Sequence, residues 1–393
     1  MHPGSHAQNT PDKAAAIDAR TGEVLTYADL DARSNRLAQL LWAEGLRPGD
    51  HIAVFLENHL RYFEVAWAAF RSGLYLTTVN RYLTAPEAAY IVEDCGAVVL
   101  VSSRAVHAAA SEIPEHAKGC RRFLVVDGAP ESGSSRFESF EEAVDVYPAE
   151  PLAEQPLGEF MLYSSGTTGR PKGIAHPLSG RSVSAGLPMA VTVGRLFGVD
   201  ADTVYLSPAP MYHSAPIGFS TAVQSLGGTV VMMDRFDALE ALEALEKYAV
   251  THSQWVPTMF SRMLKLPDEE RVRFDLSVHR VAIHGAAPCP RRVKEAMFAW
   301  WGSILHEYYG GTESNGLTYV GPEAWLSHPG TVGRAVLGKI HICNEEGAAL
   351  PNAEAGLVYF ERKRVPFSYH KDPSKTRSAQ HPAHPTWTTL GDI

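Results

Sequence analysis

Residues 163–173 read YSSGTTGRPKG and follow the apolar run at residues 160–162. Glycines let the backbone turn tightly with its N–H groups pointing inward, and the hydroxyls and the closing lysine add donors for anionic oxygens. A flexible turn would explain a lone Gly-Thr-Gly, but not this density of donors. We therefore predict that phosphate is held by Ser164, Ser165, Gly166, Thr167, Thr168, Gly169 and Lys172.

The spacing of this loop separates it from the P-loop of nucleoside triphosphatases. A Walker sequence has four residues between its glycines and ends in lysine followed by serine or threonine. Here two residues separate Gly166 from Gly169, and Lys172 is followed by Gly173. The loop is therefore expected to serve a different phosphate chemistry.

The composition favours a protein with more than one packed unit and a small-molecule ligand. The 393 residues are 45% apolar and carry a formal net charge of −9, so the chain can bury sizeable cores. The densest basic run, residues 362–364, is too short to offset the negative charge. A nucleic-acid partner is therefore not expected.

The cysteines and histidines do not indicate a disulfide framework or a metal centre. The four cysteines lack CxxC spacing, and the N-terminus has no apolar core like that of a signal peptide, so we expect a reduced cytoplasm. The 17 histidines are dispersed along the chain. No apolar run approaches the length of a membrane span, while a peripheral membrane contact and a homodimer remain open.

Apolar runs and helical stripes alternate through most of the chain, which predicts an α/β fold with mostly parallel, covered sheets. Strands are expected at residues 51–56, 97–101, 123–126, 203–206, 229–233, 254–256, 278–283 and 303–305. Helices are expected at residues 26–45, 60–73, 139–144, 219–226 and 238–248. Short strands at 340–343 and 357–360 predict a β-rich subdomain over about residues 330–393, after two α/β subdomains over about residues 1–329.

Small residues follow the strand expected at 278–283. Gly285, Ala286 and Ala287 would let a planar ligand lie close to the backbone. The same segment is also explained as a plain strand-to-helix turn, with Pro288 and Pro290 starting the next helix.

A more informative motif is YYGGTE at residues 308–313, just past the strand expected at 303–305. A tyrosine can cover a base, a threonine can bond a phosphate oxygen, and a glutamate can hold Mg²⁺. The alternative is a core tyrosine pair followed by an exposed acid at a turn.

The chain ends with TLGDI at residues 389–393, where Asp392 could accept hydrogen bonds from ribose hydroxyls. Taken alone, Gly-Asp is also an ordinary turn pair.

Together, YSSGTTGRPKG, YGGTE and TLGD resemble, in this order and at wide separation, the adenylate-forming superfamily of acyl-CoA synthetases, amino-acid-activating adenylation domains and beetle luciferases. The resemblance spans nearly the whole chain, since residues 25–43, 80–84, 256–258 and 369–376 also match family positions. It implies a large N-terminal domain of two αβα-layered subdomains plus a small β-barrel. A mobile C-terminal lid of roughly a hundred residues would follow.

The resemblance implies that ATP binds with Mg²⁺. Residues 165–172 would wrap the β- and γ-phosphates, with Lys172 as a catalytic cation. The base would lie between Tyr309 and the small residues Gly285, Ala286 and Ala287, with Glu307 at its edge and Tyr308, Gly310 and Gly311 beside it. Thr312 would bind the α-phosphate, Glu313 the Mg²⁺, and Asp392 the ribose.

Attack by a carboxylate on the α-phosphorus would then give acyl-AMP and pyrophosphate, and a coenzyme A thiol would displace AMP. Both partners of the first step are anionic, so positive charge and oriented donors are required before they can approach.

The segment PMYH at residues 210–213 suggests which class of carboxylic acid is activated. Amino-acid-activating relatives carry an aspartate here, whereas a Tyr-His pair resembles fatty, aryl or steroidal acyl-CoA synthetases. His213 would line the acyl entrance or approach the carboxylate, although a purely structural histidine stays open. Trp255 and Met259 could wall an apolar tunnel, with plain core packing as the alternative.

The sequence stops at Ile393, directly after the aspartate motif, so the lid and its lysine are missing. We expect a truncated chain that binds ATP or acyl-AMP but adenylates poorly. Alternatives are a lid-less, non-catalytic nucleotide- or acyl-binding module, an acyl-AMP ligase that loads a carrier protein, and a luciferase-like oxygenase.

Overall fold

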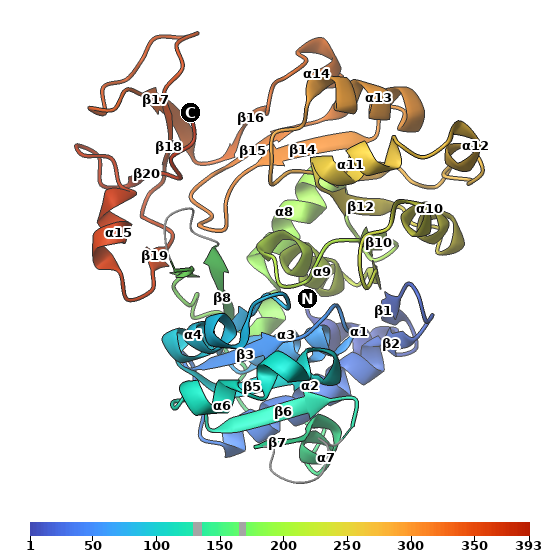
Figure 1. The fold of residues 1–393 in the computed structure, drawn as a ribbon, viewed down its shortest axis with the longest axis vertical. Coiled ribbons are helices and arrows are strands. Elements are labelled where there is room, and N and C mark those ends of the chain that lie inside the picture. Colours follow the sequence, from blue (N-terminus) through green and yellow to red (C-terminus); the bar gives the residue numbers. More distant parts are fainter. Residues whose placement is uncertain (129–135, 165–169) are drawn as a thin grey trace. The chain divides into compact units, whose positions relative to one another are not determined.

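A computed structural model describes residues 1–128, 136–164 and 170–393. The chain forms two compact units. The first comprises Met1–Tyr163, Leu178–Gln254 and Phe274–His279, and the second Ser164–Pro177, Trp255–Arg273 and Arg280–Ile393. Both contain strands flanked by helices (Figure 1).

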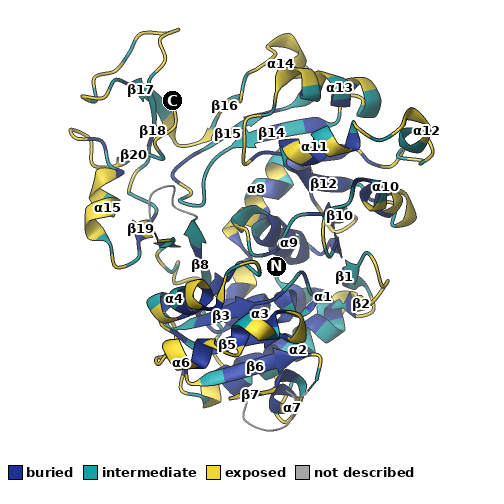
Figure 2. Ribbon diagram, viewed as in Figure 1, coloured by how far each residue is buried: buried dark blue, intermediate teal, exposed yellow. Residues whose placement is uncertain are grey.

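The first unit contains a parallel sheet with the strand order β8-β4-β3-β5-β6-β7. Its strands are β3 (His51–Phe55), β4 (Tyr75–Thr78), β5 (Ala97–Ser103), β6 (Arg122–Val126), β7 (Phe137–Ser139) and β8 (Glu159–Ser164). Figure 2 shows buried residues along β3, β5 and β6. The prediction of a covered parallel sheet is confirmed.

Some helices of this layer begin at side-chain caps that the sequence provides. Thr26 and Asp29 form a capping box at the start of α2 (Tyr27–Ala43), whose leucines Leu30, Leu37, Leu40 and Leu41 are buried. Ser139 caps α7 (Phe140–Asp145) by accepting from the Glu142 N–H. The other helices here are α1 (Pro3–Asn9), α3 (Arg61–Arg71), α4 (Ala85–Cys95), α5 (His107–Ala110) and α6 (Ile113–His116), with a 3₁₀ turn at Arg104–Val106.

A second group of strands in the first unit has the order β12-β10-β11-β1-β2. Its members are β1 (Ala14–Asp18), β2 (Val24–Thr26), β10 (Val204–Ser207), β11 (Thr229–Met232) and β12 (His252–Trp255), all parallel except β2. Trp255, the last residue of β12, is assigned to the second unit. The helices α8 (Pro188–Phe197), α9 (Ser214–Leu226) and α10 (Ala238–Lys247) accompany it, with a 3₁₀ turn at Val183–Ala185. Trp67 of α3 joins the two layers of this unit, because its Nε1–H donates to Gln224 Oε1 of α9 at 2.8 Å.

The second unit contains a parallel pair, β13 (Val281–His284) and β14 (Leu305–Tyr309), connected by α13 (Arg291–Trp301). Antiparallel strands β15 (Leu317–Val320) and β16 (Arg334–Leu337) continue from β14. The strand expected to end at residue 305 begins there instead, so Tyr308 and Tyr309 lie within β14. The short helices are α11 (Pro257–Met263), α12 (Asp268–Arg271) and α14 (Pro322–Ser327).

The β-rich part of the second unit contains an antiparallel sheet of β17 (Lys339–Cys343), β18 (Leu357–Glu361) and β20 (Trp387–Thr389), which lie side by side in Figure 1. The Trp387 ring stacks between His341 and His384, with centroid distances of 3.6 and 4.1 Å. Separately, β9 (Lys172–Ala175) pairs with β19 (Ser368–Tyr369), which precedes α15 (Pro373–Ser378). A closed β-barrel stays a prediction.

Within the described ranges, the helices lack the combination of length and apolar character that crossing a membrane requires. The four cysteines are free thiols.

Candidate functional site

The loop predicted to hold phosphate is described at its two ends. Ser164 is the last residue of β8, and Lys172 is the first residue of β9. The predicted ligands Ser165, Gly166, Thr167, Thr168 and Gly169 lie outside the described residues.

The ammonium of Lys172 is held by a carboxylate that the sequence analysis did not single out. Lys172 Nζ forms an ion pair with Asp372 Oδ2. The other oxygen, Oδ1, caps α15 by accepting from the Lys375 N–H and the Ser374 hydroxyl, at 2.9 and 2.7 Å. These hydrogen bonds, with Lys172 first, hold the pKa of Asp372 well below its ordinary value. The cation therefore lies beside a fully ionised carboxylate.

The predicted magnesium ligand Glu313 is linked to the same strand pair. Its Oε1 accepts from the Tyr369 hydroxyl at 2.9 Å, and Tyr369 pairs with Ile174 across β19 and β9. Burial, followed by the Glu313 charge, raises the pKa of Tyr369, so this hydroxyl stays a donor. Among the described residues, the hydrogen bond to this partly buried carboxylate reaches Oε1, and carboxylate oxygens such as Oε2 are ligands that Mg²⁺ accepts. The donor set therefore fits the ion that the motif implies.

His176, one residue beyond β9, supports the segment that carries Thr312. Its Nε2 lies 2.9 Å from the Thr312 carbonyl oxygen and its Nδ1 lies 3.0 Å from that of Pro366. The sequence offered no signal for this residue, because Thr312 and Pro366 lie far away along the chain.

Tyr309 and Asp392, predicted to bind base and ribose, are brought together. The Tyr309 hydroxyl donates to Asp392 Oδ2 at 2.6 Å, and its ring stacks on Phe360 at 6.1 Å between centroids. Burial, followed by Asp392, raises the pKa of Tyr309, which keeps the hydroxyl protonated. Ribose-binding and base-binding candidates thus share one edge of the second unit.

The small-residue segment is packed against the neighbouring tyrosine. A Cβ at Gly285 would lie 2.8 Å from Cζ of Tyr308 and 2.9 Å from its carbonyl oxygen. Ala286 follows with a φ of 68°, in the left-handed region. The close approach to Tyr308 therefore requires glycine at residue 285.

Glu307 is buried at the level of His284 on the adjacent strand. Its Oε2 lies 2.5 Å from Nζ of Lys294, a buried residue of α13 that the sequence analysis did not consider. A lysine amid the apolar stripe of a helix is a signal of a buried partner, since lysine is rarely buried unpaired.

The candidate acyl-site residues lie in different units. His213 precedes α9 in the first unit, with its ring 4.3 Å from that of Tyr212. Burial lowers the pKa of His213, which favours the neutral imidazole. Trp255 and Met259 belong to the second unit, where Trp255 is 1% exposed and packs against Trp301 at 5.5 Å.

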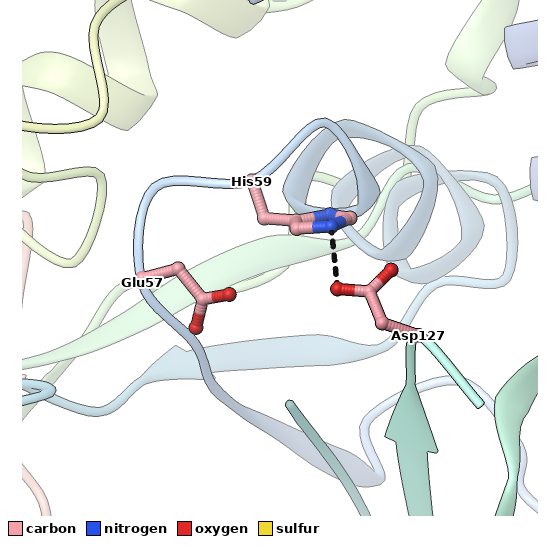
Figure 3. A group of neighbouring side chains, drawn as sticks. All are labelled: Glu57, His59 and Asp127. Atoms are coloured by element: carbon pink, nitrogen blue, oxygen red, sulfur yellow. Dashed lines mark ion pairs between the residues drawn. The ribbon is translucent and has the colours of Figure 1, made fainter. Parts of the chain in front are cut away.

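Glu57, His59 and Asp127 in the first unit form a group whose potential ligand atoms lie within 4.8 Å of one another. Figure 3 shows Asp127 facing the His59 ring, and the two are 3.2 Å apart at Nε2. The Arg61 backbone N–H donates to Nδ1 of His59 at 3.1 Å, which places the ring proton on Nε2, facing Asp127. This tautomer has no free lone pair for a metal, so a hydrogen-bonded turn accounts for the group.

Comparison with known proteins identifies the class. Residues 5–369 match the family model described as AMP-binding enzyme, and the chain belongs to this family. It is 30% identical over 405 residues to 4-coumarate–CoA ligase 5 of Oryza sativa subsp. japonica, covering 97% of this chain and 70% of that protein. It is 28% identical over 380 residues to the fatty acid–[acyl-carrier-protein] ligase ScoC of Streptomyces coeruleorubidus, covering 94% and 70%.

A solved structure supports the fold. The N-terminal domain of FACL13 from Mycobacterium tuberculosis aligns with a TM-score of 0.81 at 23% identity, covering 100% of this chain and 96% of that one. The mixed α/β fold of acyl-CoA synthetase N-terminal domains is thereby confirmed. Ligases of the adenylate-forming family use ATP and Mg²⁺, with coenzyme A as a second substrate.

Proposed function

We propose that the protein activates a hydrophobic carboxylic acid with ATP, giving acyl-AMP and pyrophosphate, and then transfers the acyl group to coenzyme A. The observation that carries this proposal is the convergence of motifs in the second unit. Lys172 and Glu313 both contact the segment of residues 369–372, through Asp372 and Tyr369. Charged groups from three distant motifs are therefore held beside one strand pair, β9 and β19.

In this proposal the nucleotide binds along the ends of β9, β14 and β20. The adenine lies between Tyr309 and Gly285–Ala287, with Glu307 at its edge, and Asp392 accepts from the ribose. Support comes from the hydrogen bond between Tyr309 and Asp392, which already aligns these two side chains. Thr312, whose carbonyl contacts His176, is proposed to bind the α-phosphate.

The triphosphate is proposed to replace Asp372 as the partner of Lys172. A carboxylate and a phosphate present similar anionic oxygens, so the ammonium can exchange one for the other. Residues 164–169 would add backbone and hydroxyl donors to the β- and γ-phosphates, and Glu313 would hold Mg²⁺. The metal supplies positive charge that offsets the charge of the phosphates.

The first chemical step forms a bond between the acid's carboxylate oxygen and the α-phosphorus and breaks the bond to pyrophosphate, which leaves with the electron pair. In the second step the sulfur of coenzyme A attacks the acyl carbon, the thiol loses its proton, and AMP leaves. The residues proposed here act by orienting the two anions and by offsetting their charge.

The proposed acid is fatty, steroid- or bile-acid-like, or aryl. His213 is held neutral by burial, and a neutral imidazole suits an apolar substrate near the acid's entrance. We propose His213 as a residue that contacts the acid, and the acyl contacts expected of Trp255 and Met259 stay predictions. Support for the aryl class comes from the similarity to a 4-coumarate–CoA ligase.

The second candidate function is transfer of the acyl group to a carrier protein. The similarity to a fatty acid–[acyl-carrier-protein] ligase favours it, and the first step would be the same.

The test is pyrophosphate release by the full-length protein with a panel of short, long-chain, steroidal and aryl acids. Lys172→Ala and Glu313→Ala are expected to reduce release by about 100-fold or more, as removal of a single transition-state donor does in other enzymes. Lys265→Met, which removes an exposed charge, is the control.

Undiminished release in both alanine variants would refute the assignment of these residues. Release that is followed by a thioester with free coenzyme A supports the leading function. Release with thioester formed solely on a phosphopantetheinylated carrier protein supports the second. Binding of ATP without release for any acid would favour a binding module.

A further inference from the structure

Lys294 is a buried cation close to the base edge of the proposed nucleotide site. Its side chain is 1% exposed and that of Glu307 is 8% exposed, and Nζ lies 2.5 Å from Glu307 Oε2. The same Nζ lies 4.7 Å from the centre of the Trp325 ring, which covers the pair. A buried ion pair of this kind is costly to break, because either partner alone would be an uncompensated charge.

Lys294 is the positive charge that faces Glu307 among the described residues. His284 Nε2 lies 3.8 Å from the same carboxylate oxygen, but burial, Lys294 and His306 lower the pKa of His284 well below its ordinary value, so the ring is neutral. The thiol of Cys289 is neutral as well, since burial and Glu307 raise its pKa to about 11. Lys294 is therefore the charged group that holds the Glu307 carboxylate in place.

The second oxygen of Glu307 is left for a ligand. The contacts of the carboxylate with described residues, from Lys294 and from His284, all reach Oε2. Oε1 accepts no hydrogen bond from the described part of the chain. A carboxylate pinned by one oxygen presents the other in a fixed direction, and an ionised oxygen can accept but cannot donate.

We propose that Lys294 is a positioning residue that holds the Glu307 carboxylate in one orientation, so that Oε1 accepts from the 6-amino group of adenine and rejects 6-oxo purines. This inference rests on the proposed function, in which the base lies at Glu307. A 6-oxo group is an acceptor and would face another acceptor, which leaves both without a donor.

Removal of the Lys294 cation should change the preference of the site between bases and not merely lower its affinity. Without Lys294 the buried carboxyl group would lose the ammonium that holds Oε2 in place, so Oε1 would no longer be fixed toward the base. Lys294→Met is therefore expected to lose the preference for adenine over 6-oxo purines.

The experiment compares the binding of AMP and of IMP to the full-length protein by calorimetry. These ligands differ at the 6-position, and neither requires catalysis. The wild-type protein and the control Lys265→Met should prefer AMP by about tenfold or more, the range expected for a charged hydrogen bond. Lys294→Met should bind AMP and IMP with affinities within about threefold of each other, and Lys294→Arg should restore the preference for AMP.

Equal losses of AMP and IMP affinity in Lys294→Met would overturn the proposal, because a purely structural role lowers both alike. If Lys294→Met does not fold, the variant Lys294→Met/Glu307→Gln removes both buried charges. The amide that replaces the carboxylate can donate or accept a hydrogen bond. This double variant should therefore bind AMP and IMP with affinities within about threefold of each other. A retained tenfold preference in this double variant would equally overturn the proposal. Pyrophosphate release by the wild-type protein tests the proposed function separately.

Discussion

The ion pair between Lys172 and Asp372 places a carboxylate where the proposed function requires a phosphate. Because Asp372 also caps α15, its position is fixed by two further hydrogen bonds and not by Lys172 alone. An anion that enters must therefore compete with a fixed negative charge for the ammonium.

Asp372→Asn tests this competition. Asparagine caps helices about as well as aspartate, so α15 should be kept while the charge is removed. We expect ATP to bind several-fold more tightly, because Lys172 loses an ionic partner and the phosphates lose a nearby negative charge. Calorimetric titration with ATP measures the change.

Asp372→Ala serves as the comparison, since it removes both the charge and the cap. Weaker ATP binding by Asp372→Asn would show that Asp372 orients Lys172 and does not compete with phosphate.

The substitution Gly285→Ala should destabilise the fold, although it adds only one methyl group. The added Cβ would meet the Tyr308 ring and backbone at 2.8–2.9 Å, and β13 or β14 would have to shift. We expect a loss of about 1–3 kcal/mol in the free energy of unfolding, the range for overpacking. Urea denaturation measures this loss. Gly218→Ala in α9 is the control, because the nearest atom is 4.0 Å away; equal losses in both variants would contradict the argument.

At the scale of elements, α1 depends on neutral histidines. Burial, followed by the charge of Arg71 and partly offset by Asp31, lowers the pKa of His2 to about 4. Burial also lowers the pKa of His6, aided by the N-terminus and Lys13, and Nε2 of His6 donates to the Ser225 carbonyl at 3.1 Å. Both rings are docked in the uncharged form.

Acidification should therefore release α1. The undocked histidines take up protons near pH 6.5 and the docked ones do so at lower pH, so docking is fully favourable above this value and is lost as pH falls. Hydrogen exchange at residues 3–9, corrected for the intrinsic rate, should lose protection between pH 7 and pH 5. The reference is α10, which contains no histidine; an unchanged difference between α1 and α10 would refute the prediction.

The elements that the sequence predicted are those with a strong local signal. Buried runs such as residues 51–56 and capped stripes such as 26–45 show their burial directly in their composition. The strand β1 was missed because AAAID has little β-branched character, and α8 because its glycine and threonine weaken the helical pattern. Contacts with other elements of the first unit decide the conformation of both segments.

At the scale of the whole molecule, the two layers of the first unit are joined by a buried hydrogen bond. Trp67→Phe would leave Gln224 Oε1 without the indole N–H that it accepts at 2.8 Å. We expect a loss of about 1–3 kcal/mol in the free energy of unfolding, the cost of leaving a buried polar group unpaired. Chemical denaturation measures it, with Trp42→Phe at a 46% exposed position as the control. Equal effects would contradict this role.

The sequence predicts some residues of the candidate site but not the partners that they contact. Lys172, Glu313 and Asp392 could be singled out because their motifs concentrate glycines, hydroxyls and charges. Their partners Asp372 and Tyr369 lie in a segment noted for its resemblance, but nothing local shows that they face residues 172 and 313. Such contacts depend on the pairing of β9 with β19, which links positions nearly two hundred residues apart.

The stacking of Trp387 between two imidazole rings has an optical consequence. Face-to-face neighbours at 3.6 and 4.1 Å can quench the excited indole, so this tryptophan should emit weakly among the seven of the chain. It begins the strand that leads directly to Asp392. A ligand that engages Asp392 would disturb the stack, and the chain would then carry its own fluorescent reporter of nucleotide binding.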